Sequence, residues 1–231
     1  MTFVDIGSGR GNSILMASKL WGGDGIGYET SLNRNAEAIE RGYDCRLESA
    51  LDALPKLGDG CFDYAVINHF LEHLAGTGEV RTIIQHACRV TSGFVFVAGP
   101  WFDSDGPLFR RGLKIFASDW PEDHPTRVTM MDLYRAFQDF MPGGTLKLYG
   151  RQPITSTDHH YLFPIQAVTR GLKGPYHYDP EQHGAKPAGE YIDGCFWEVC
   201  AIAYRPGNES AAERFEENQE GKTTCLTTQS L

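Results

Sequence analysis

The sequence has no pair of cysteines in a C-x-x-C arrangement, although it contains six cysteines. Without such pairs, no zinc framework is visible. The first residues also lack the basic stretch and apolar run of a secretory signal. No window approaches the roughly 18 consecutive apolar residues of a membrane span. Scattered thiols in a chain without these signals predict a reducing, cytoplasmic location and no association with a membrane.

A basic surface is the second missing feature. The formal net charge is −9, and the lysines and arginines are scattered except for a small cluster at Arg110, Arg111 and Lys114. Because contacts with phosphates dominate the affinity of proteins for nucleic acids, such proteins usually carry a basic patch or stripe. We therefore expect no nucleic-acid partner, whereas a nucleotide or a sugar is compatible with the acidic balance.

What the sequence does have is an alternation of strand-like and helix-like segments. The predicted strands are residues 2–6, 25–29, 44–47, 62–67, 94–98, 146–149 and 198–204. The predicted helices are residues 13–20, 32–41, 80–90 and 130–140. Alternation of this kind favours a parallel sheet covered by helices. A chain of 231 residues, 41% of them apolar, suits one such α/β domain, which we place at residues 1–205.

Two regions interrupt the alternation. An insertion at about residues 153–196 is rich in His, Tyr, Gly and Pro, and it has too many aromatic residues for pure disorder. Loops of this length in a compact domain are usually functional or disordered. Residues 206–231 are polar, and we expect them to form a flexible tail.

The strongest local signal is a glycine-rich loop directly after the first strand, V-D-I-G-S-G-R-G at residues 4–11. Glycines allow a tight strand-to-helix turn and let a ligand approach the bare backbone. Asn12 stands where the dinucleotide fingerprint needs a small residue, so the NAD or FAD pattern fails. Glu29 ends the second strand twenty residues after Gly9, where a carboxylate can accept both ribose hydroxyls of an adenosine ligand.

Together, these features resemble the cofactor site of class I S-adenosylmethionine-dependent methyltransferases. The stretches D-G-C-F-D-Y-A-V-I at residues 59–67 and L-E-H-L at residues 71–74 are similar to motifs of the small-molecule, type 11-like branch. The resemblance covers residues 3–99 well and residues 126–137 more loosely. It implies a Rossmann-like doubly wound sheet, mostly parallel with an antiparallel last strand, and S-adenosyl-L-methionine (SAM) as the cofactor.

The resemblance also implies roles for individual residues. Asp5 would orient the methionine portion of the cofactor, and Glu29 would hold the ribose. The cofactor's cradle would be formed by Gly7, Ser8, Gly9 and Gly11. The adenine would be flanked by Glu48 and Ser49, and the floor below the sulfonium would be lined by Asn68 and His69.

The proposed chemistry is methyl transfer to oxygen or nitrogen of a small-molecule or sugar-like acceptor. His69 and His124 are the candidates for removing a proton from an acceptor hydroxyl, and no metal is implied. His69 could equally be a packing residue. We interpret Asp63 as structural, the pair Glu72 and His73 as capping or packing residues, and the run Asp158-His159-His160 as a polar loop.

Three further questions stay open at the level of sequence. Family members usually carry a helix before the first strand that helps to cover the cofactor, but here that strand starts at residue 2. Either the insertion or a subunit partner covers the cofactor instead, or the sequence is truncated. We expect residues 100–128 to form the acceptor wall and residues 154–196 its lid. The alternatives are methylation of a macromolecule, or a non-catalytic cofactor-binding or partner subunit, and a homodimer is compatible with either.

Overall fold

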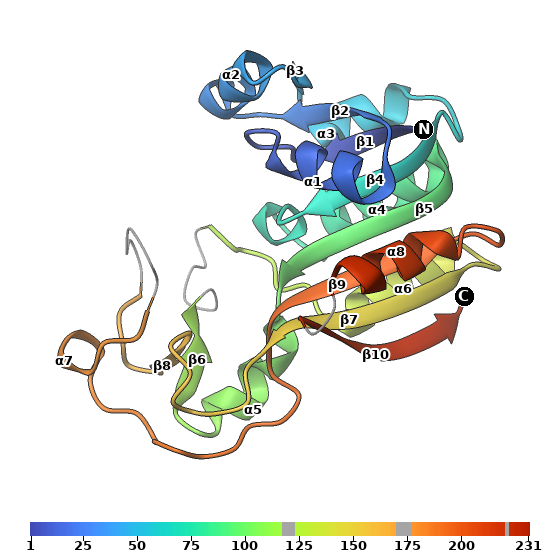
Figure 1. The fold of residues 1–231 in the computed structure, drawn as a ribbon. Helices are drawn as coiled ribbons and strands as arrows, with labels where there is room; N and C mark the ends of the chain where they lie inside the picture. Colours follow the sequence, from blue (N-terminus) through green and yellow to red (C-terminus); the bar gives the residue numbers. More distant parts are fainter. Residues whose placement is uncertain (117–122, 170–176, 220–221) are drawn as a thin grey trace.

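The computed structural model describes residues 1–116, 123–169, 177–219 and 222–231. An eight-stranded sheet with the order β10-β7-β9-β5-β4-β1-β2-β3 forms its centre (Figure 1). Its strands are β1 (Thr2–Ile6), β2 (Asp24–Glu29), β3 (Asp44–Leu47), β4 (Phe62–Asn68), β5 (Thr91–Pro100), β7 (Thr145–Pro153), β9 (Phe196–Tyr204) and β10 (Thr223–Ser230). Strands β1 to β5 pair in parallel, and β9 is antiparallel to both β5 and β7. The predicted Rossmann-like sheet with an antiparallel late strand is confirmed.

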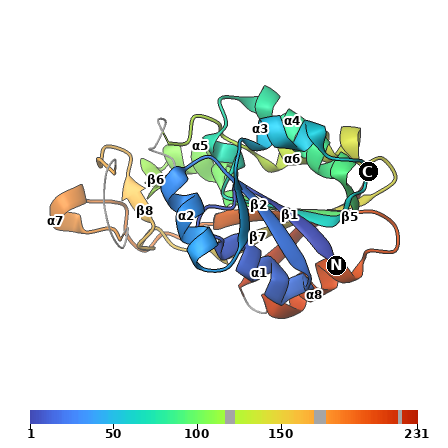
Figure 2. The same ribbon diagram turned by 90° about the horizontal axis from the view of Figure 1, so that it is seen from above.

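Helices cover both faces of this sheet. The longer ones are α1 (Asn12–Trp21), α2 (Leu32–Glu40), α4 (Thr77–Val90), α6 (Met130–Phe140) and α8 (Ser210–Asn218). Helices α1 and α8 lie on one face, and α4, α6 and the short α3 (Ala50–Ala53) lie on the other (Figure 2). Among the described residues, no helix combines the length and apolar character needed to cross a membrane.

The two faces have separate cores because successive side chains of a strand point to opposite sides. In β1, Phe3 packs into the core under α1 and α8, whereas Val4 packs into the core under α4 and α6. Tyr64 and Ala65 divide in the same way in β4. Continuous apolar runs in the parallel strands are therefore explained by burial on both faces.

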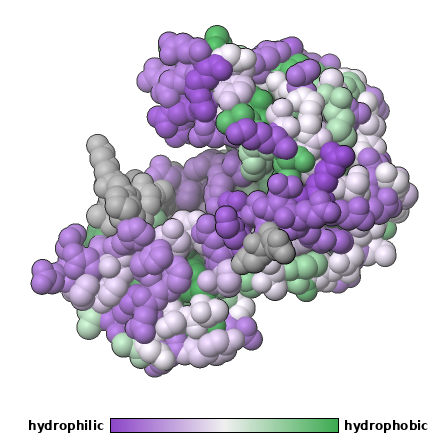
Figure 3. Space-filling model, viewed as in Figure 1, coloured by the Kyte–Doolittle hydropathy of each residue, from purple (hydrophilic) through white to green (hydrophobic). Residues whose placement is uncertain are grey.

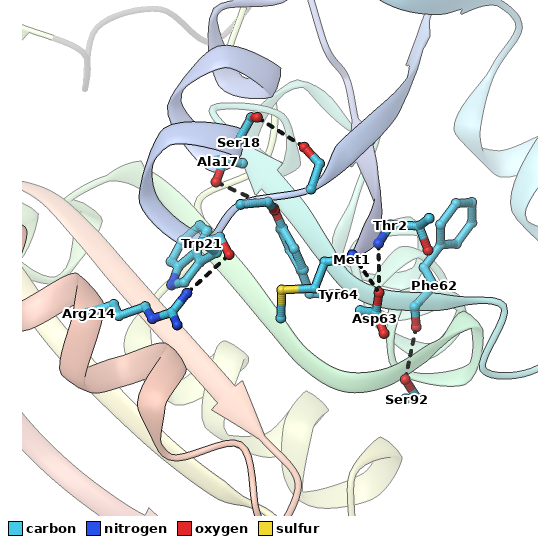
Figure 4. Close-up of polar contacts among 12 residues, drawn as sticks. Met1, Thr2, Ala17, Ser18, Trp21, Phe62, Asp63, Tyr64, Ser92 and Arg214 are labelled. Atoms are coloured by element: carbon cyan, nitrogen blue, oxygen red, sulfur yellow. Dashed lines mark hydrogen bonds and ion pairs between the residues drawn. The ribbon is translucent and has the colours of Figure 1, made fainter.

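Asp63 has a structural role at the start of β4, as predicted. Its carboxylate accepts a hydrogen bond from the backbone N–H of Thr2 at 2.6 Å, which ties the start of β4 to the start of β1 (Figure 4). The adjacent Tyr64 donates from its hydroxyl to the carbonyl of Gly22 at 2.8 Å. Both contacts lie at the amino ends of the strands, away from the glycine-rich loop.

The expected flexible tail is wrong, because residues 210–218 form α8 and residues 223–230 form β10. The indole N–H of Trp21 donates to the carbonyl of Ala211 at 2.9 Å. Arg214 donates to the carbonyl of Trp21 at 3.2 Å (Figure 4). Ala211, Ala212 and Phe215 form the buried stripe of α8. The segment is polar overall, but these three residues have the spacing of an amphipathic helix, which composition alone obscures.

The two long loops form one unit beside the sheet. Strand β6 (Leu113–Ile115) follows β5 and pairs antiparallel with β8 (Leu162–Pro164), which belongs to the segment between β7 and β9. The short helices α5 (Asp105–Phe109) and α7 (Pro180–His183) complete this unit (Figure 1). Figure 3 shows the surface hollowed between this unit and the part that contains α2, on the side to which β4 and β5 point.

Candidate functional site

The glycine-rich loop connects β1 to α1, and its three glycines have different roles. Gly7, Gly9 and Gly11 all have positive φ angles, of 76°, 53° and 80°. A Cβ atom would lie 2.3 Å from the ring of Phe70 at Gly7 and 2.2 Å from the ring of Tyr43 at Gly11. At Gly9 such an atom would meet nothing within 4 Å. The outer two glycines therefore permit packing, and Gly9 presents open space to a ligand.

Glu29 connects the end of β2 to this loop. One carboxylate oxygen accepts the N–H of Gly9 at 2.9 Å, and the other accepts the N–H of Ser31 at 2.7 Å. The residue is only 8% exposed. Since each carboxylate oxygen can accept more than one hydrogen bond, Glu29 retains capacity for the hydroxyl of a ligand.

A cavity of about 220 Å³ opens beside Glu29 at the carboxyl ends of the strands. Four of the predicted site residues line it, namely Gly7, Glu29, Glu48 and His69, which come from four separate segments. Glu48 forms an ion pair with Lys56 at 2.6 Å. His73 and Asp123 line the same cavity, so it extends from the predicted ribose ligand to the loop after β5.

Asp5 and Ser8 lie behind the loop rather than in the cavity wall. Asp5 is fully buried; its Oδ2 accepts a hydrogen bond from the hydroxyl of Ser13 at 2.5 Å, and its Oδ1 has no hydrogen-bond partner in the described part of the chain. Burial raises the pKa of Asp5 to about 7, against the lowering effect of the Ser13 hydrogen bond. The Ser8 hydroxyl is 3.0 Å from the thiol of Cys45 and is also buried. Both side chains support the loop from inside.

Asn68 and Ser49 are placed near the cavity, but neither is among its lining residues. Asn68 is the last residue of β4, and Ser49 is the residue before α3. Ala50, the neighbour of Ser49, does contribute to the cavity wall. Their predicted contacts with the cofactor therefore stay predictions.

His69 has the most unusual environment of the predicted residues. Its φ angle of 51° lies in the left-handed region, which non-glycine residues rarely adopt and which is often found at functional sites. Its Nε2 is 2.9 Å from Glu198, and its Nδ1 is 3.3 Å from Glu72. Arg151 forms an ion pair with the same Glu198.

The charge of this histidine follows from its two carboxylate neighbours. Burial lowers the pKa of His69, but the hydrogen bond with Glu198 and the negative charges of Glu198 and Glu72 outweigh burial and raise it to about 9. His69 is therefore protonated at neutral pH, and a protonated imidazole cannot take a proton from an acceptor. This arrangement argues against the predicted base role and places a cation in the cavity wall.

Glu198 was missed by the sequence analysis, although the sequence contains a signal for it. It is the single charged residue in the strand F-W-E-V-C-A-I-A-Y, and it is 6% exposed in β9. Because an unpaired buried charge is very costly, a carboxylate inside an apolar strand predicts a cationic partner. Here the partners are His69 and Arg151.

His124 lies beside His73 rather than in the floor of the cofactor cradle. The two rings are 5.0 Å apart between centroids, and the ring of Phe102 is 6.4 Å from His124. The interpretation of Glu72 and His73 as simple packing residues is incomplete, because His73 lines the cavity. Glu72 is 2% exposed and contacts the floor residue His69.

The aromatic residues of the loop after β5 mostly belong to the core. Trp101, Phe102 and Phe116 are each at most 5% exposed, whereas Phe109 is 66% exposed. Trp120 lies outside the described residues. Trp101 packs into the main core, and Phe116 packs with Phe163 and Ala167 in the unit beside the sheet, so neither ring presents a stacking surface to an acceptor.

The histidine-rich run of the insertion forms a ring cluster. The rings of His159 and His160 stack at 4.4 Å, and His177 contacts His160 at 4.5 Å. Burial, with the neighbouring His160 and Lys186, lowers the pKa of His159 to about 4. No strand includes residues 158–160, in agreement with the interpretation of this run as a loop, and the neighbouring rings of His159 and His160 stack on each other.

Comparison with known proteins gives a result at the level of structure. No family model and no curated protein matches this sequence. A SAM-dependent methyltransferase from Archaeoglobus fulgidus is similar over 88% of this chain and 86% of its own, with a TM-score of 0.56 and 15% identity. The YcgJ protein from Bacillus subtilis matches over 88% and 91%, with a TM-score of 0.59 and 15% identity. A geranyl diphosphate methyltransferase in complex with SAM matches over 88% and 77%, with a TM-score of 0.53 and 17% identity.

At these identities the likeness concerns the fold. The chain has the Rossmann-like fold of class I SAM-dependent methyltransferases, and the match extends over most of its length. The fold that the glycine-rich loop and the L-E-H-L stretch implied is therefore confirmed.

Proposed function

We propose that the protein is a SAM-dependent methyltransferase that acts on oxygen or nitrogen of a small-molecule or sugar-like acceptor. The observation that carries the proposal is the pairing of Gly9 with Glu29. An open backbone approach at the end of β1 adjoins a buried carboxylate at the end of β2, and the carboxylate's cavity continues to His69. In open α/β sheets, ligands bind outside the carboxyl ends of the strands in this way.

Within this proposal, each part of the cofactor is assigned to residues in or beside the cavity. Glu29 accepts the ribose hydroxyls, and Gly9 allows close approach of the chain to the methionine portion. Glu48 lies on the adenine side, with Ser49 behind it. The bound cofactor supplies an activated methyl group on a sulfonium, so the chain mainly supplies alignment and exclusion of water. Asp5 supports the loop that carries these contacts through the hydrogen bond that its Oδ2 accepts from Ser13.

The acceptor is proposed to enter on the side of His73 and His124. This side faces the loop after β5, whose strand β6 is paired with β8 of the insertion. We propose that the insertion, which is joined to this loop by the pairing of β6 with β8, covers the acceptor side. With a net charge of −9, a neutral small acceptor fits better than a nucleic acid.

Calorimetry with SAM, its demethylated product and NAD tests the cofactor. We expect binding of the first two and little binding of NAD. Tight binding of NAD without binding of SAM would overturn the assignment. Incubation with SAM and a panel of acceptors, read by mass, then identifies the acceptor through a product heavier by one methylene unit.

A further inference from the structure

Three ligand-type side chains meet beside the cavity, and one of them, His73, lines it. Glu72 and His73 belong to a 3-10 helix, η2 (Leu71–His73), shortly after β4, and His124 lies between β6 and α6. One ligand atom from each residue lies within 4.8 Å of the other two. Two histidines and one glutamate, with a further position open, form a ligand set found in catalytic zinc sites.

Hydrogen bonds hold the two segments in this arrangement. The backbone N–H of Thr126 donates to the carbonyl of Glu72 at 3.3 Å. The Thr126 hydroxyl donates to the carbonyl of Leu74 at 2.7 Å, and Thr126 is 4% exposed. These bonds place His124, two residues earlier, against the ring of His73.

His73 has the second-shell partner typical of a metal-bound histidine. Its Nδ1 is 2.6 Å from the carbonyl oxygen of Asp123. A carbonyl can only accept, so Nδ1 carries the proton and donates it. In the neutral ring the lone pair then lies on Nε2, which is available to a cation.

Glu72 supplies the independent observation that points to a ligand. Its side chain is only 2% exposed, and its Oε1 has no hydrogen-bond partner among the described residues. The Nδ1 of His69 lies 3.3 Å away but without hydrogen-bond alignment. The ion pair with His69 offsets part of the cost of this buried charge, and coordination to a second cation would satisfy the oxygen that lacks a hydrogen bond.

We propose that Glu72, His73 and His124 bind a divalent transition metal of the zinc class, which activates the acceptor. This inference rests on the proposed function for its chemistry, and it departs from the expectation that no metal takes part. His73 and Asp123 line the same cavity as Gly7 and Glu29, so the metal site adjoins the site of the methyl donor.

The metal lowers the pKa of an acceptor hydroxyl that occupies the open position. The hydroxyl proton leaves to water. A lone pair of the oxygen forms the new O–CH₃ bond while the S–CH₃ bond breaks, and that electron pair stays on sulfur. The products are the methyl ether, the neutral thioether form of the cofactor and one proton.

Titration of the metal-free protein with Co²⁺ tests the site by its visible absorption, independently of activity. We expect one Co²⁺ per chain, competed by Zn²⁺, with affinity at least tenfold weaker in both His73→Ala and His124→Ala. His160→Ala and His86→Ala are the matched controls, and we expect both to retain the affinity of the native protein. The two test histidines are less buried than Glu72, so these variants avoid the buried position.

Several results would overturn the site. They are absence of Co²⁺ binding, unchanged binding in the two test variants, loss of binding in His160→Ala, and a near-ultraviolet thiolate band that indicates cysteine ligands. Calorimetry with SAM on the same samples separates the two proposals. Binding of SAM without binding of metal leaves the proposed function intact and removes the metal site, whereas the reverse result retains the site and removes the methyltransferase.

Discussion

Replacement of Glu29 by alanine tests the cofactor site most directly. The carboxylate accepts two backbone N–H groups, from Gly9 at 2.9 Å and from Ser31 at 2.7 Å, and it is the proposed ligand of the ribose. One substitution therefore removes support of the loop and contact with the cofactor together. The two effects are measured separately, by denaturation of the free protein and by calorimetry.

The expected magnitudes follow from hydrogen bonds to a charged group. Such a bond contributes about 1.5–3 kcal/mol, so loss of the ribose contact in Glu29→Ala weakens binding of SAM by roughly 10- to 150-fold. The free energy of unfolding falls by roughly 2–4 kcal/mol, because two N–H groups lose their acceptor. Since the loop is partly open, water replaces some of these bonds and the lower values are expected.

Glu29→Gln and Glu40→Ala complete the experiment. The amide keeps one acceptor oxygen, so the stability of Glu29→Gln is expected to lie between those of the native protein and Glu29→Ala. Glu40 is an exposed glutamate at the end of α2, and its replacement is expected to change neither quantity. A folded Glu29→Ala protein with the native dissociation constant for SAM would refute the assignment of the ribose ligand.

Three other predictions concern the loop and the last helix. The pKa of Asp5 is 3.8 in the unfolded chain and about 7 in the folded protein, so the free energy of unfolding falls as the pH rises from about 4 to 7 and is constant above pH 7. Urea denaturation of ligand-free Asp5→Asn at several pH values is expected to lack this fall. Gly9→Ala is expected to cost only about 1–2 kcal/mol of stability but to abolish binding of SAM. Gly11→Ala places a methyl group against Tyr43 and is expected to lower the melting temperature more. Equal melting temperatures of the two variants would contradict the packing argument. Phe215→Ala is expected to cost about 3–5 kcal/mol in denaturation, and no change would mean that α8 is not part of the core.

The sheet could be predicted because its signals are local. Apolar runs that end at glycine or an acidic residue mark β1 and β2, and regular spacing marks α4 and α6. The late part was harder, because α8 and β10 are polar segments whose stability depends on partners far away in sequence. Strand β10 pairs with β7 from Thr223 to Ser230, and no pattern within residues 223–230 predicts that pairing.

The cofactor half of the site could also be predicted, since a spacing rule places Glu29 against the glycine-rich loop. The acceptor half could not, because it depends on contacts between distant segments. Glu198 follows His69 by 129 positions in the sequence, and its contact with His69 keeps that ring protonated, whereas a base would have to be neutral. Likewise, the approach of His124 to His73 depends on the hydrogen bonds of Thr126, which no spacing rule predicts.

The ladder between β6 and β8 has a consequence for recombination between related proteins. Further bonds extend it, from Ile165 N–H to the carbonyl of Gly112 at 2.8 Å and from Phe116 N–H to the carbonyl of Tyr161 at 3.3 Å. A shift of one residue in either strand would turn its side chains to the opposite face. Chimeras that exchange the proposed acceptor-side loops must therefore transplant residues 101–128 and 154–195 as a matched pair, because either segment alone would face a strand of foreign register.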